Sequence, residues 1–171
     1  MANPMASFIP KTDALGKFAR DSWTRLATVP GGKALFSRLI GLAAPYSSTI
    51  GAQVVELGRG YSKVVMKDRR AVRNHLASVH AVALVNLAEL AGNVALLFSM
   101  PDDARFIVSG LSIEYLKKAR GPITATSVCP IPETNERREY DVPVEMRNAA
   151  GELVARAVLK SLVGPGGKKK G

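Results

Sequence analysis

Residues 74–98 have the sequence NHLASVHAVALVNLAELAGNVALLF, and this stretch decides the fold. Glu89 is the only formally charged residue between Arg73 and Asp102. A helix that is apolar on every side must be surrounded by other elements. In lipid, Glu89 and the two nearby asparagines would be costly near the centre of a membrane span. We therefore predict a helix buried in the core of the protein, and no membrane span.

The segments on both sides of this helix have the two-residue hydrophobic period of β-strands. Before the helix, residues 51–57 and 61–67 are predicted to form a hairpin. After it, the predicted strands are residues 106–116, 123–129, 139–147 and 153–163. An antiparallel sheet can cover a helix with one face and leave the other face to solvent. The pattern predicts an α+β fold in which an antiparallel sheet wraps around one long buried central helix.

The chain of 171 residues is long enough for a core without disulfides or metals. Residues 1–48 are predicted to form an N-terminal helical extension, with helices at 13–28, capped by Asp13, and at 33–43. Residues 49–163 form the sheet-and-helix domain, and residues 164–171 a disordered basic tail. The first ten residues lack the basic start and apolar run of a secretory signal, which predicts a cytoplasmic protein.

The composition narrows the classes of function. With 24 Lys and Arg against 14 Asp and Glu, the net charge is +10, so an anionic partner is expected. Aromatic residues make up only 6% of the chain, so platforms for base stacking are sparse and specific nucleic-acid binding ranks last. One cysteine, Cys129, and two histidines exclude a disulfide framework and predict no metal site.

The start of the central helix is a candidate site. Backbone N–H groups there have no partner within the helix and can bind an anion or polarise a carbonyl oxygen. Glu89 lies nine residues after His80, which places it roughly 13 Å along the helix axis and about 180° around it. Glu89 therefore cannot act on a substrate held at the start of its own helix. An active site that combines both features needs two protomers.

Asn74, His80 six residues later and Glu89 nine residues after that resemble the pattern of hotdog-fold thioesterases. The resemblance is to an uncharacterised bacterial branch, a domain of unknown function related to phenylacetate-pathway-type acyl-CoA thioesterases. It covers about residues 26–164 and rests on the phrases APY (44–46), VRNHL (72–76), SVHA (78–81), NLAE (86–89) and LSIEYLKKARG (111–121).

This resemblance implies the hotdog fold and the hydrolysis of an acyl-CoA, or a similar acyl thioester, at sites shared between protomers. It implies a homodimer, or a tetramer built as a dimer of dimers. No cofactor is expected, since coenzyme A enters as part of the substrate. Glu89 matches the general base or nucleophile of characterised members. Asn74 and the backbone N–H of Ala81 match the groups that polarise the thioester carbonyl, and His80 matches the histidine that opens the helix.

A hydroxyl on the following strand is expected to orient water, and Ser109 is preferred over Ser112. The phosphates of coenzyme A call for Arg or Lys side chains near the mouth of the site. Two basic clusters are candidates for this role: Arg69, Arg70 and Arg73, and Lys117, Lys118 and Arg120. For each cluster, an ordinary solvated face is the alternative.

Three alternatives stay open. Characterised relatives follow the histidine with two glycines, which permit close approach of a ligand, whereas this sequence has Ala81 and Val82. That departure motivates a non-catalytic hotdog module that binds an acyl-CoA or lipid-like ligand. Glu89 and His80 also have structural alternatives to a catalytic role. Glu89 is a candidate for a buried, hydrogen-bonded acid at a dimer contact, and His80 is a candidate for a helix cap.

Overall fold

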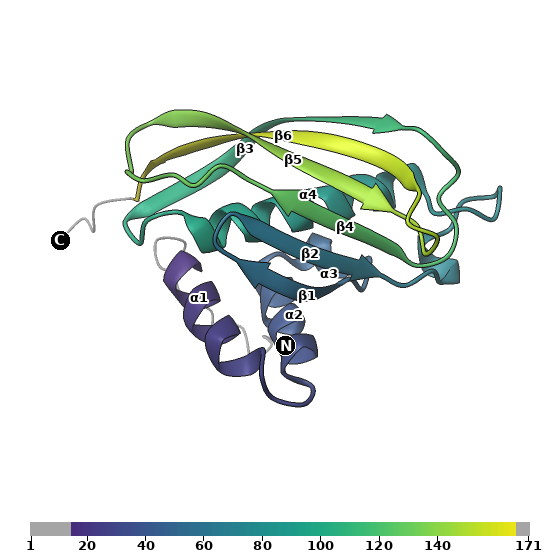
Figure 1. The fold of residues 1–171 in the computed structure, drawn as a ribbon, viewed down its shortest axis with the longest axis horizontal. Coiled ribbons are helices and arrows are strands. Elements are labelled where there is room, and N and C mark those ends of the chain that lie inside the picture. Colours follow the sequence, from purple (N-terminus) through teal and green to yellow (C-terminus); the bar gives the residue numbers. More distant parts are fainter. Residues whose placement is uncertain (1–14, 167–171) are drawn as a thin grey trace, which may run out of the picture.

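A six-stranded antiparallel sheet wraps around helix α4 (Ala81–Ser99) in this computed structural model, which describes residues 15–166 (Figure 1). Its order is β1-β2-β4-β5-β6-β3, and every neighbouring pair is antiparallel. The strands are β1 (Gln53–Gly58), β2 (Tyr61–Met66), β3 (Ala104–Tyr115), β4 (Ile123–Val128), β5 (Arg138–Arg147) and β6 (Leu153–Pro165). The predicted α+β architecture is confirmed.

Helix α4 is the core helix, as its composition predicts. By length and hydropathy it is the one helix among residues 15–166 that could cross a membrane. Its side chains pack instead against the sheet, most extensively against β2, β4 and β5, and Leu87, Ala91 and Leu96 are fully buried. The apolar composition of α4 is therefore explained by burial within the fold.

Gly92 lets α4 lie close to the sheet. A Cβ atom at this position would come within 3.0 Å of Leu159 and 3.2 Å of Val142, on strands β6 and β5. Protein interiors tolerate added volume poorly, and overpacking typically costs 1–3 kcal/mol. The absence of a side chain at Gly92 thus sets the distance between helix and sheet.

We expect Gly92→Leu to lower the free energy of unfolding by about 2 kcal/mol or more, because its side chain has no space against β5 and β6. Urea denaturation measures this change. Gly58→Ala is the matched control, since no atom lies within 4 Å of a Cβ added there, and we expect a change within about 0.5 kcal/mol. Equal stability of Gly92→Leu and the wild type would contradict the packing argument.

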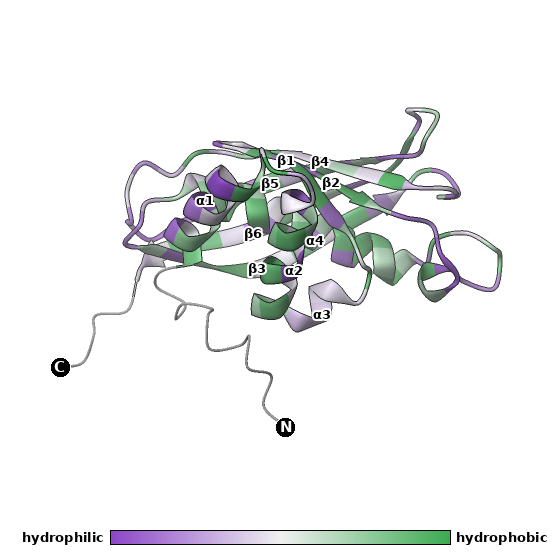
Figure 2. Cartoon of the chain, turned by 90° about the horizontal axis from the view of Figure 1, so that it is seen from below, coloured by the Kyte–Doolittle hydropathy of each residue, from purple (hydrophilic) through white to green (hydrophobic). Residues whose placement is uncertain are grey.

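Three N-terminal helices lie on the other side of α4 from β5 and β6 (Figures 1 and 2). They are α1 (Leu15–Leu26), α2 (Gly32–Ala43) and the short α3 (Pro45–Ser48); η3 (Arg70–Val72) is a single 3-10 turn later in the chain. The turn between α1 and α2 uses Gly31 in the left-handed region, at a φ of 76°. Trp23 and Phe36 then join the two helices edge to face, with ring centroids 5.0 Å apart.

Arg20 fastens α1 to the end of α4. Its guanidinium donates hydrogen bonds to the carbonyls of Phe98 and Met100, each at 3.1 Å, and pairs with Asp102. A cation at a helix C-terminus also interacts favourably with the helix dipole. The helical extension is therefore held against the core by specific contacts as well as by apolar packing.

At both ends of the chain, the predicted segments extend beyond the described residues. Asp13, predicted to cap the first helix, lies outside the described residues. Strand β6 continues to Pro165, so it includes the first two residues of the predicted tail, and residues 167–171 of that tail also lie outside the described range.

Candidate functional site

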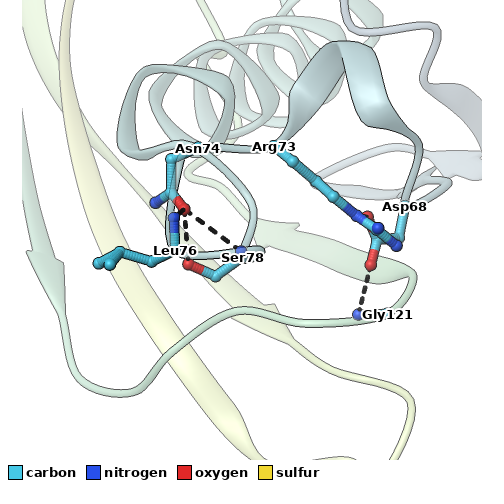
Figure 3. Close-up of polar contacts among 6 residues, drawn as sticks. All are labelled: Asp68, Arg73, Asn74, Leu76, Ser78 and Gly121. Atoms are coloured by element: carbon cyan, nitrogen blue, oxygen red, sulfur yellow. Dashed lines mark hydrogen bonds and ion pairs between the residues drawn. The ribbon is translucent and has the colours of Figure 1, made fainter.

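The loop before α4 holds the side chain of Asn74 in a fixed orientation (Figure 3). The Asn74 Oδ1 atom accepts hydrogen bonds from the N–H of Leu76 at 2.9 Å, and from the N–H and the hydroxyl of Ser78 at 3.3 and 3.1 Å. These donors require the oxygen to face the loop, so the orientation of the amide follows from its contacts. The Asn74 Nδ2 group points away from them and donates no hydrogen bond within residues 15–166.

The start of α4 offers a second free donor beside this amide. The Nδ1 atom of His80 accepts from the N–H of Val82 at 3.1 Å, so His80 caps the helix. The backbone N–H of His80 donates to Val72 O at 2.8 Å. The N–H of Ala81, between these two, has no acceptor in the described part of the chain. The Nδ2 group of Asn74 and the N–H of Ala81 are therefore free donors at one end of α4 within residues 15–166.

Glu89 lies in the middle of α4, away from these donors. It is half-buried, and its carboxylate makes no hydrogen bond or ion pair with any described residue. Eight residues separate it from Ala81, or about 12 Å along the axis, which a glutamate side chain cannot span. Glu89 shares an incompletely buried stripe of α4 with Val82 and Val85. A single chain therefore does not bring the predicted acid and the predicted donors together.

Ser109 lies apart from both groups. Its hydroxyl donates to Glu139 at 3.0 Å and to Lys160 O at 3.1 Å, on the face of the sheet that points away from α4. The register of β3 against β6 shifts between Val108 and Gly110, so Ser109 occupies a β-bulge. The geometry gives no support to the prediction that Ser109 orients water in this site. Ser112 also points outward, because it belongs to the exposed side of β3.

Tyr115 is a residue of this region that the sequence analysis did not identify. Its hydroxyl donates to Ala81 O at 3.3 Å, so the ring lies against the first turn of α4. The side chain is 49% exposed, and partial burial raises the pKa of its phenol. The alternation of Leu111, Ile113 and Tyr115 after the bulge is the pattern that indicates this position in the sequence.

The two basic clusters come together beside the start of α4. The N–H of Gly121 donates to Asp68 at 2.9 Å (Figure 3). The N–H of Val79 donates to Ala119 O at 2.8 Å. The segment that follows β3 therefore lies against the loop that precedes α4. Any anion held at this end of the helix would have both clusters nearby.

Half of the six basic side chains are engaged within the protein. Arg69 donates to Thr49 O at 2.6 Å, Arg73 pairs with Asp68 at 2.6 Å, and Lys117 pairs with Glu152 at 2.6 Å. The others are exposed and form no ion pair with residues 15–166: Arg70, Lys118 and Arg120. These three remain available to a bound anion.

The ion pair between Asp68 and Arg73 makes stability depend on pH. The Arg73 guanidinium holds the pKa of the Asp68 carboxyl below its ordinary value; burial opposes this shift, and the Gly121 N–H adds to it. A depressed folded pKa means that the stabilisation is complete above the unfolded pKa of about 3.9 and is lost as pH falls through the folded pKa.

We expect Asp68→Asn to unfold at a lower urea concentration than the wild type at pH 7. The difference should shrink below about pH 4, where the wild-type carboxyl takes up its proton as well. Urea titrations at pH 7 and pH 3 measure it. Glu133→Gln, at an exposed position, is the control and should show little difference at either pH. A wild-type advantage that grows on acidification would contradict the assignment.

Comparison with known proteins places the fold. A family model, domain of unknown function DUF4442, matches residues 32–163. No curated protein matches the chain. A solved structural-genomics protein is 35% identical, with a TM-score of 0.74, over 86% of this chain and 99% of that one.

Two solved thioesterases resemble it at lower identity. A thioesterase from Haemophilus influenzae is 16% identical with a TM-score of 0.64, over 74% of this chain and 87% of its own. A thioesterase family protein from Silicibacter pomeroyi is 17% identical with a TM-score of 0.66, over 89% and 99%. The predicted hotdog fold is confirmed by these likenesses, which at such identity concern the fold alone.

Proposed function

The chain belongs to the DUF4442 family within the hotdog-fold thioesterase superfamily, and from that premise we propose that it is an acyl-CoA thioesterase with active sites shared between two protomers. One observation carries the proposal. Asn74 and the Ala81 N–H present free donors at one end of α4, while the carboxylate of Glu89 is unpaired among the described residues and lies beyond their reach. A second copy of the chain would supply the missing half.

In the proposed reaction, the thioester carbonyl oxygen receives hydrogen bonds from Asn74 Nδ2 and the Ala81 N–H of one protomer. Donors placed where negative charge develops are a main source of rate acceleration in acyl transfer. Glu89 of the other protomer removes a proton from water, and the water oxygen attacks the carbonyl carbon. The carbon–sulfur bond then breaks, and the departing thiolate takes up the proton from Glu89.

Glu89 as a nucleophile is the alternative form of this reaction. Its carboxylate would attack the carbonyl carbon, and the carbon–sulfur bond would break to release the thiolate, which takes up a proton from solvent. Water would then hydrolyse the resulting anhydride to the free acid and Glu89. A single turnover in ¹⁸O-labelled water separates the two forms. A general base places the label in the released acid in the first turnover. A nucleophile whose own carboxyl carbon is attacked by the water instead releases an acid that carries one of the unlabelled Glu89 oxygens, and the label enters Glu89.

Strand β3 supports the pairing of two protomers. It is the last strand of the sheet, and in the described range only β6 pairs with it. An exposed edge of 12 residues is a ready template for another strand. Its inner face is only partly covered, since Phe106 and Leu111 are half-buried and α4 lies mainly over β2, β4 and β5. We propose a homodimer through this edge, testable by light scattering.

The phosphates of coenzyme A would lie near the exposed Arg70, Lys118 and Arg120. Arg and Lys side chains bind phosphate through charge-assisted hydrogen bonds. The two loops that carry them are joined beside the start of α4, where the thioester is proposed to lie. This arrangement accounts for part of the positive charge without a nucleic acid.

The test is turnover of acyl-CoA esters from acetyl to palmitoyl by the purified protein, followed as thiol release. Turnover that requires Glu89 supports the proposal, and no turnover with any ester contradicts it. The alternative, a module that binds an acyl-CoA without hydrolysis, is favoured by Val82, whose side chain is 50% exposed and adjoins the Ala81 N–H. Saturable binding with no thiol release would favour that alternative.

A further inference from the structure

A cavity lies between the N-terminal helices and α4. Its volume is about 200 Å³, and its walls come from α1, α2, α3, α4 and the start of β3. Phe18 and Ile40 line it from the helical extension, and Leu90 and Leu97 from the core helix. The walls are mainly apolar, and such cavities favour apolar ligands over water.

The cavity begins within one helical turn of Glu89. Leu90 and Asn93 both line it, and Asn93 lies four residues after Glu89 on the same side of α4. Residues four apart on a helix are neighbours, with Cβ atoms about 5–6 Å apart. A group bonded to a carbonyl carbon beside Glu89 can therefore continue along α4 into this space.

A buried polar atom of the wall lies near Glu89. The Asn93 Oδ1 atom is buried and has no hydrogen-bond partner in the described structure. Farther along, Val94 and Leu97 of α4 and Met100 after it line the cavity; Ser47 of α3 and Arg105 at the start of β3 are the other polar residues of the wall. The cavity thus has a polar atom next to the proposed reaction centre and a mainly apolar wall.

We propose that this cavity holds the hydrocarbon chain of the acyl thioester and that the N-terminal helices set its length limit. The proposal rests on the thioesterase function proposed above and names the substrate class of that same site. An apolar cavity of about 150 Å³ accommodates benzene, so about 200 Å³ suits a chain of about six to eight carbons. Longer chains would have to displace α1, which Arg20 fastens to the end of α4.

S-alkyl coenzyme A thioethers, from ethyl to dodecyl, test this with no turnover required. Calorimetry on the intact protein should show affinity rising about fourfold per methylene, the usual value for burying one, until the cavity is full. Beyond about eight carbons the affinity should level off or fall. Free octanoate is a separate arm: binding as tight as that of the octyl thioether would show a site for fatty acids and overturn the thioester assignment.

Variants in the extension should move the limit in opposite directions. Ala43→Phe adds volume at an exposed lining position and should shorten the optimal chain by about two carbons. Phe18→Ala removes volume and should lengthen it by a similar amount. Leu35→Ala is the control, since Leu35 lies on α2 outside the cavity. Ser47→Leu is a second filling variant if Ala43→Phe does not fold.

The outcomes separate this inference from the proposed function. A chain-length limit that both variants shift, without thiol release from any ester, would support the cavity and refute hydrolysis. Turnover that requires Glu89, with the same chain-length profile in wild type, Ala43→Phe and Phe18→Ala, would overturn the cavity assignment and leave hydrolysis standing. No binding of any thioether would overturn the cavity assignment, and together with no thiol release from any ester it would overturn both.

Discussion

Glu89→Gln is expected to lower kcat for the best acyl-CoA ester by about a thousandfold, within the range of 10²–10⁴ for losing a positioned acid or base. Glutamine has nearly the same size and shape, but it cannot accept the proton of the attacking water. Thiol release under saturating substrate measures the effect. Because Glu89 makes no polar contact within residues 15–166, the folding of each protomer should be unchanged.

Glu89→Gln is expected to lower kcat and kcat/KM by the same factor and to leave KM nearly unchanged. Loss of an interaction made only in the transition state lowers kcat and kcat/KM together. The affinity of the octyl thioether should therefore change little in Glu89→Gln. Glu133→Gln, on an exposed loop, serves as the control for removal of one negative charge. Full activity in Glu89→Gln would refute the assigned role, and a loss confined to KM would reassign Glu89 to substrate binding.

The elements of the fold follow from the sequence because burial imposes strong periodicity. Helix α4 is apolar on every side, and the six strands alternate between a face toward α4 and a face toward solvent. The phase of an individual strand is harder to predict. In β3, extending the alternation of Leu111 and Ile113 backward puts Ser109 on the inner face. The bulge adds one residue there and turns Ser109 outward.

The candidate site could be predicted in its residue types but not in its contacts. Asn74 is identified by its resemblance to the asparagine of hotdog-fold thioesterases. The fixing of its oxygen by Leu76 and Ser78 depends on a turn with Ala77 at a φ of 53°. The pairing of charged side chains is equally hard to predict from the sequence. Lys117 is neutralised by Glu152, which is 35 residues away, and such pairs form only once β3 and β6 align. Sequence position alone cannot distinguish a free cation from a paired one.

The cavity could not be predicted from the sequence either. Its walls come from α1, α2, α3, α4 and β3, so no local segment contains its pattern. The sequence predicts two N-terminal helices, the first with a broad apolar side, but not the element against which they pack. Only the packing of α1 against α4, through Gly16 and Arg20, shows that the extension borders the region next to Glu89. A length limit for the substrate is therefore a property of the assembled fold.

Asn74→Asp is expected to lower kcat by at least about a hundredfold, the usual cost of losing one donor to the developing oxyanion. The substitution keeps an oxygen that can accept from Leu76 and Ser78, so the loop should retain its structure. It replaces the Nδ2 donor with a second oxygen. Unchanged thermal unfolding together with the loss of activity would separate this effect from damage to the loop. Activity equal to the wild type would remove Asn74 from the proposed site.

Mixing the two inactive variants tests whether the site is shared. In a hybrid dimer of Asn74→Asp and Glu89→Gln, one site combines the intact Asn74 of one chain with the intact Glu89 of the other. Random association makes about half of all dimers hybrids, each with one working site of two, so about a quarter of wild-type activity should return. A site contained within one chain would leave every site of the hybrid defective. We therefore expect activity to return after co-expression and to be absent from the separate preparations. The reason is that Ala81 and Glu89 lie about 12 Å apart along α4, eight residues of helical rise, so one chain cannot supply both groups to one site.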